Sequence, residues 1–116
     1  MKGFTIYHNP RCSKSRAALE ILKNHHINPE VIEYLKTPLN LDQIKQLRAH
    51  FDLKEFVRQN EPAFKMLGLS LDCNEDKILE AILKEPILLQ RPIVTYGDKA
   101  IIARPPEKVL SLIDSK

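Results

Sequence analysis

The segment Phe4-Thr5-Ile6-Tyr7-His8-Asn9-Pro10-Arg11-Cys12-Ser13-Lys14-Ser15-Arg16 joins two different local patterns. Its first four residues are aromatic (Phe4, Tyr7) or β-branched (Thr5, Ile6), which predicts a strand over residues 4–8. The residues after Cys12 have helical composition and predict a helix over residues 13–24, ended by His25-His26. Cys12 is therefore expected at the turn between a strand and the first turn of a helix.

This position favours the thiolate form of Cys12. The N–H groups at a helix start have no partner within the helix, and the helix dipole places partial positive charge there. The flanking Arg11, Lys14 and Arg16 add cationic charge. A protonated His8 is within reach across the turn. We therefore expect a lowered pKa and a nucleophilic sulfur, because an apolar, packed thiol fits poorly between cationic side chains.

The remaining sequence predicts a single α/β domain over residues 1–116. A second strand is expected over residues 31–35 and two more over residues 92–96 and 99–102, with Gly97-Asp98 as a two-residue hairpin turn. A strand, a helix and a strand in this order predict a parallel pair, so the whole is a four-stranded mixed sheet. Pro105-Pro106 is expected to open the final helix, whose expected apolar face is Val109, Leu110, Leu112 and Ile113.

Between the second and third strands, apolar residues recur at helical spacing, which predicts a helical insertion over about residues 40–85. Asn40 and Gln43 have the spacing of an N-cap pair at its first helix. Shorter helices are expected over residues 55–58 and 62–67, and Gly68 is expected to cap the second of them.

Composition narrows the function classes. The 116 residues are 43% hydrophobic and 28% charged, with a formal net charge of +3 from dispersed basic residues. No basic stripe favours nucleic acid, and no stretch has the length of a membrane helix. Two cysteines form no disulfide framework, and the histidines and cysteines lack the paired spacing of a zinc site. We expect a cytoplasmic protein, a monomer without a bound metal or cofactor.

Three arginines lie close to prolines: Arg58, Arg91 and Arg104, the last two immediately before one. Taken singly, each is a surface arginine. Taken with a thiolate, guanidinium groups are what nucleophilic attack on an oxyanion requires, because they bind its oxygens bidentately and keep their charge. The chemistry predicted is thiolate attack on arsenate, phosphate or a similar oxyanion, or exchange with an anionic thiol such as glutathione.

Together, Tyr7-His8-Asn9-Pro10-Arg11-Cys12, Arg91-Pro92-Ile93-Val94 and the run 104–110 resemble the glutaredoxin-related arsenate reductases of bacteria. The resemblance implies a thioredoxin/glutaredoxin-like fold, with glutathione as co-substrate and glutaredoxin as partner. It also implies that Cys12 is the nucleophile, that His8 favours its thiolate, and that Pro92 follows a cis peptide bond. By the same resemblance, the anion site consists of Arg58, Arg91 and Arg104, with Ser15 and Pro92 as supporting residues.

The chain is more similar to the shorter, chromosomal members than to those of resistance operons, which commonly have Gly-Thr-Ser where this chain has Ser13-Lys14-Ser15. Two alternatives stay open: a monothiol, glutathione-linked oxidoreductase that does not act on arsenate, and a regulatory module similar to Spx. The second needs another cysteine where Ser15 stands. Cys73 is a candidate resolving cysteine. The phosphatase-like arsenate reductases are excluded, because they need an arginine six positions after the cysteine and this chain has Ala18 there.

Overall fold

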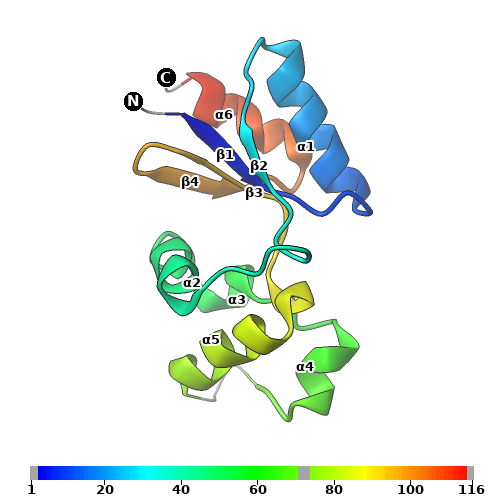
Figure 1. The fold of residues 1–116 in the computed structure, drawn as a ribbon, viewed down its shortest axis with the longest axis vertical. Coiled ribbons are helices and arrows are strands. Elements are labelled where there is room, and N and C mark those ends of the chain that lie inside the picture. The colour runs from blue at the N-terminus through cyan, green and yellow to red at the C-terminus, as the bar shows by residue number, and fades with distance from the viewer. Residues whose placement is uncertain (1–2, 71–73, 115–116) are drawn as a thin grey trace. The chain divides into compact units, whose positions relative to one another are not determined.

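The computed structural model describes residues 3–70 and 74–114 and contains a four-stranded mixed sheet (Figure 1). The strands are β1 (Phe4–Tyr7), β2 (Glu30–Ile32), β3 (Ile93–Tyr96) and β4 (Lys99–Ile102), in the order β2-β1-β3-β4. β1 pairs parallel with β2 and antiparallel with β3, and β3 pairs antiparallel with β4. This confirms the predicted sheet, including the two-residue turn at Gly97-Asp98.

The chain divides into two compact units, residues 1–37 with 91–116 and residues 38–90. The first, called the sheet unit below, holds the four strands with α1 (Ser13–Asn24), the 3₁₀ helix η2 (Pro106–Lys108) and α6 (Val109–Asp114). The second, the helical unit, holds the segment predicted as an insertion. The number of independently folding domains stays a prediction.

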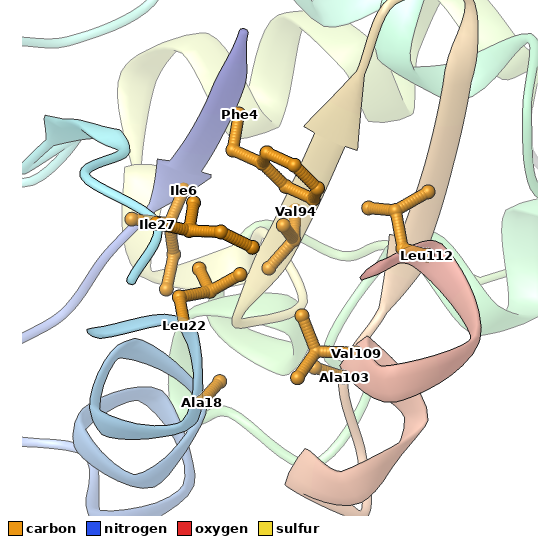
Figure 2. Packing of buried hydrophobic residues seen from close by; sticks show 9 residues of the cluster. All are labelled: Phe4, Ile6, Ala18, Leu22, Ile27, Val94, Ala103, Val109 and Leu112. Carbon is orange, nitrogen blue, oxygen red and sulfur yellow. The ribbon is translucent and has the colours of Figure 1, made fainter. Parts of the chain in front are cut away.

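In the sheet unit, α1 and α6 pack on one face of the sheet, as Figure 2 shows. Alternation along β1 turns Phe4 and Ile6 to this face, whereas Thr5 and Tyr7 face the other way and are half-buried. The helices contribute residues at helical spacing, such as Ala18 and Leu22 of α1. The cluster comprises Phe4, Ile6, Ala18, Leu22, Ile27, Val94, Ala103, Val109 and Leu112.

The end of α1 confirms the role predicted for His25-His26. The N–H groups of His25, His26 and Ile27 donate to carbonyls of the last helical turn, and His26 has a φ of +61°. Such a left-handed residue ends a helix by satisfying carbonyls that lack a partner within it. The chain then turns towards β2.

The helical unit contains α2 (Leu41–Arg48), α3 (Leu53–Phe56), α4 (Pro62–Met66), α5 (Glu75–Lys84) and the 3₁₀ helix η1 (Pro86–Leu88). The predicted cap of α2 is confirmed, since Asn40 and Gln43 each accept a backbone N–H from the other. Gly68, with a φ of +68°, follows α4 and donates its N–H to Lys65 O, as predicted for a capping glycine.

Four local predictions were wrong. β2 ends at Ile32, two residues before Tyr34, because the N–H groups of Lys36 and Thr37 both donate to Glu33 O in a turn. The helix expected over residues 55–58 lies at Leu53–Phe56, because Val57 is extended and forms a β-bridge with Leu89.

The other two concern exposure and helix type. Leu110 is 37% exposed, because the buried face of α6 runs through Val109 and Leu112, with Ile113 beside them. The prolines before α6 open a 3₁₀ turn, not the α-helix itself. No helix in the described ranges, residues 3–70 and 74–114, is both long and apolar enough to span a bilayer.

Candidate active site

The register of the sheet brings three distant segments to one end of the sheet unit. The loop to Cys12 follows Tyr7, the last residue of β1, which pairs with Ile93, the first residue of β3. Ile93 in turn pairs with Ile102, the last residue of β4. Arg91-Pro92, immediately before β3, and Arg104, shortly after β4, are therefore at the same end as Cys12.

The loop before α1 is held by its own backbone and by Asn9. Cys12 is the N-cap of α1, with its N–H donating to Asn9 O at 2.9 Å. The side-chain oxygen of Asn9 accepts the N–H of Arg11 at 3.0 Å. Arg16 donates from its guanidinium to Pro10 O at 2.8 Å. Each of these bonds restricts the backbone that carries the sulfur.

The environment of Cys12 favours the thiolate. Burial of the half-buried side chain raises the pKa of the Cys12 thiol, but the backbone N–H groups of Ser15 and Lys14 and the Arg91 guanidinium outweigh it, so the pKa is lowered. The N–H groups stabilise the thiolate, as predicted for the start of a helix. The main side-chain contribution comes from Arg91, whereas the sequence pointed to Arg11, Lys14 and Arg16.

Arg91 and Pro92 are joined immediately before β3. The peptide bond between them is cis, as predicted, and the Arg91 guanidinium forms a hydrogen bond with Cys12. Pro92 O accepts the N–H of Ala103 at 2.9 Å, which fixes this segment to the residue after β4. The bond between Arg104 and Pro105 is also cis, which the sequence analysis did not anticipate.

Arg104 is bonded to the Arg91 backbone. Its Nη1 donates to Arg91 O at 2.9 Å. Both residues are half-buried. The sheet unit thus holds two of the three predicted anion-site arginines near the thiol. Arg91 is hydrogen-bonded to the sulfur, and Arg104 is hydrogen-bonded to the Arg91 backbone.

Arg58 belongs to the helical unit. Its N–H donates to Leu88 O, its Nε donates to Glu61 Oε1 at 3.0 Å, and its Nη1 donates to Gln90 Oε1 at 2.9 Å. The side chain is therefore held in a defined direction by two acceptors. Its convergence on Cys12 stays a prediction.

His8 is buried and lies against Ser15. The Nδ1 of His8 is 2.6 Å from Ser15 Oγ, and its side chain is almost inaccessible. Burial lowers the pKa of His8, and nearby Arg16 and Lys23 lower it further, against an opposing effect of Glu33. The protonated imidazole expected from the sequence is thus disfavoured. A role for neutral His8 in supporting the thiolate stays a prediction.

The sequence analysis did not identify Asn9 as a residue that holds the loop before Cys12, and it named Ser15 only as a supporting residue. Ser15 Oγ accepts the N–H of Asn9 at 3.1 Å as well as contacting His8, and Asn9 is buried. One signal was available, because Ser15 shares the helix face of Ala18 and Leu22 and so occupies a buried position. A buried hydroxyl needs hydrogen-bond partners, and here His8 and Asn9, in the loop that leads to Cys12, supply them.

Within the described residues, no group of three or more His, Cys, Asp or Glu side chains is arranged to hold a metal ion. Cys73, considered as a resolving cysteine, lies outside the described residues. The reactive group of the sheet unit is a cysteine thiolate at the N-terminus of α1, with the Arg91 guanidinium hydrogen-bonded to its sulfur.

Proteins similar to this chain in sequence and structure include arsenate reductases. An arsenate reductase of Neisseria meningitidis serogroup A is 39% identical over 97% of this chain and 100% of its own. The protein YfgD of Escherichia coli K12, whose name states no activity, is 40% identical over 97% of this chain and 98% of its own. An arsenate reductase structure from Vibrio cholerae superimposes with a TM-score of 0.90 at 37% identity, covering 95% and 97% of the two chains.

These matches extend over nearly the whole sequence and include both units. The mixed sheet with its helices is the thioredoxin-like α/β fold that the sequence predicted. The sequence model of the ArsC family matches residues 7–112, from the strand before the cysteine to the last helix. The chain therefore belongs to the ArsC family.

Proposed function

We propose that this chain is an arsenate reductase that uses the Cys12 thiolate as its nucleophile. The observation that carries the proposal is the stabilised thiolate: two backbone N–H groups and the Arg91 guanidinium lower the pKa of Cys12. Family membership and the names of relatives such as that of Neisseria meningitidis support arsenate as the substrate.

The reaction requires a two-electron reduction of arsenic. The Cys12 sulfur attacks the arsenic atom of arsenate, an S–As bond forms, and one arsenate oxygen leaves as water. Glutathione then attacks the arsenic of this adduct and displaces a second oxygen as water, so arsenic carries both sulfurs. The glutaredoxin thiolate attacks the glutathione sulfur: the arsenic–sulfur bond to glutathione breaks, its electron pair stays on arsenic, and a glutathione–glutaredoxin disulfide forms. Water hydrolyses the remaining bond between arsenic and Cys12, which releases arsenite and returns the Cys12 thiol. Overall, two thiols become one disulfide, arsenic passes from the +5 to the +3 state, and arsenite and water leave.

The guanidinium groups have a separate task in this scheme. Negative charge concentrates on the arsenate oxygens as the sulfur approaches, and preorganised cations stabilise it without reorganising. Arg91 is already beside the sulfur, and Arg58 and Arg104 are the further candidates for this anion site. The enzyme is proposed to be a monomer. Glutathione as co-substrate supports a reducing, cytoplasmic compartment, with no cofactor bound to the protein.

The proposal is tested by arsenate-dependent oxidation of NADPH in a system coupled through glutathione, glutaredoxin and glutathione reductase. We expect turnover by the native chain, none by Cys12→Ser, and nearly native turnover by the matched control Cys73→Ser. Folding of each variant is checked by circular dichroism. A folded protein that reduces glutathione mixed disulfides but not arsenate would replace arsenate reduction by monothiol oxidoreductase activity.

A further inference from the structure

Arg104 makes a contact that binding of an oxyanion does not require. Its Nη1 donates to the carbonyl oxygen of Arg91 at 2.9 Å, across 13 positions of sequence. Next to it, the N–H of Ala103 donates to Pro92 O. Consecutive residues after β4 thus hold consecutive carbonyls before β3, one through a backbone amide and one through a charged side chain.

Fixing the Arg91 carbonyl restricts the Arg91 backbone. The Arg91 side chain leaves the same residue and forms a hydrogen bond with the Cys12 sulfur. A hydrogen bond from a charged donor is stronger than a neutral one, so the bond from Arg104 resists rotation of this peptide. The direction in which the Arg91 guanidinium leaves the backbone therefore depends on Arg104.

We propose that Arg104 is a positioning residue, which holds the Arg91 guanidinium beside the Cys12 sulfur through its bond to the Arg91 carbonyl. The inference rests on Cys12 as the nucleophile of the proposed function, but not on arsenate as the substrate. It assigns Arg104 a task before any oxyanion arrives. The resemblance to relatives implied direct anion binding instead, and the two roles give different results in the absence of arsenate.

The test measures the rate of alkylation of Cys12 by iodoacetamide as a function of pH, without arsenate, in a Cys73→Ser background. The variants are Arg91→Ala, Arg104→Ala and both together. We expect Arg104→Ala to move the midpoint of the alkylation rate against pH to higher pH, in the same direction as Arg91→Ala. Alkylation near neutral pH should become several-fold slower. The double variant should behave like Arg91→Ala alone, because Arg104 acts through Arg91.

Further variants test the hydrogen bond itself. Arg104→Lys keeps a charged N–H donor only one atom shorter than Nη1, so it should retain most of the native midpoint. Arg104→Gln places its N–H donor two atoms short of the Arg91 carbonyl, so it should shift the midpoint as Arg104→Ala does. Lys99→Ala removes a positive charge from the exposed start of β4 and serves as the matched control, with no expected shift. If Arg104→Ala does not fold, Arg104→Gln replaces it: its alkylation midpoint should lie near that of Arg91→Ala, and that of Arg104→Lys should lie nearer to native.

The proposal is overturned if Arg104→Ala leaves the alkylation midpoint unchanged, or if the shifts of Arg91→Ala and Arg104→Ala simply add. An unchanged midpoint with a raised KM for arsenate would instead assign Arg104 to direct contact with substrate. Failure of the native chain to reduce arsenate would overturn the proposed function but not the alkylation result, so the two failures are distinguishable.

Discussion

Ser15 Oγ and His8 Nδ1 lie 2.6 Å apart, and the same hydroxyl oxygen accepts the N–H of Asn9. A hydroxyl oxygen can accept two hydrogen bonds, or accept one and donate one, so Ser15 satisfies both contacts with either neutral tautomer of His8. The lowered pKa of His8, caused chiefly by burial, agrees with this neutral form. Ser15 thus connects the first turn of α1 to the residues that follow β1, His8 and Asn9.

Replacing Ser15 by Ala should destabilise the protein by about 1–3 kcal/mol, because the Asn9 N–H and His8 Nδ1 are then left without their partner. The measurement is the free energy of unfolding from urea denaturation. Ser13→Ala, at the exposed start of the same helix, is the control and should change stability little. Equal stabilities of the two variants would contradict the bracing role of Ser15.

The lowered pKa of Cys12, in which opposing burial is outweighed by N–H groups and Arg91, predicts a pH-dependent contribution to stability. Between the folded and unfolded pKa values, the unfolded chain binds more protons, so this contribution rises with pH. It is complete above the pKa of the unfolded thiol, about 8.5, and is lost as the pH falls through the folded value.

The comparison is between the native chain and Cys12→Ser, both denatured by urea under reducing conditions at several pH values. The difference in unfolding free energy should increase from acidic to alkaline pH and then level off. A difference that does not vary with pH would show that the folded protein does not stabilise the thiolate.

Removing the negative charge next to Arg58 should strengthen binding of an oxyanion if Arg58 belongs to the anion site. Glu61 occupies the Nε side of its guanidinium at 3.0 Å and competes with an anion for it. Glu61→Gln keeps an oxygen acceptor there without the charge. Because partly exposed ion pairs contribute about 0.2–1 kcal/mol, the KM for arsenate should fall by up to about fivefold.

Steady-state kinetics with varied arsenate checks this. Glu75→Gln is the matched control, since Glu75 pairs with Arg48 in the same helical unit and has no proposed part in the site. An equal effect of both variants would indicate a general change of charge. A KM that rises with Glu61→Gln would show that the ion pair is needed to hold Arg58 in place.

Much of the fold was predictable from the sequence because its signals are local. The turn into α1, the cap of α2 and the hairpin at Gly97-Asp98 each depend on residues within a few positions of one another. The end of β2 was not predictable in this way. Tyr34 and Leu35 continue an apolar pattern, but Tyr34 is buried within a turn whose bonds converge on Glu33 O.

The site was predictable only where its signal is local. Cys12 was identifiable because the start of a helix follows it directly. The cation that acts on its sulfur was not, since Arg91 is brought there by pairing between β1 and β3, which no local pattern specifies. The lowered pKa of His8 depends on burial, and burial is a property of the assembled sheet unit.

The hairpin turn at Gly97-Asp98 lies at the end of the sheet opposite to the cysteine loop, because Tyr96 pairs with Phe4 and Ile93 with Tyr7. Four residues of strand at about 3.3 Å each separate the two ends by roughly 13 Å. Asp98 is exposed there. It is therefore a suitable position for a fluorophore or a surface tether, and a chain immobilised through it would keep its thiol open to the solution, as an arsenic sensor requires.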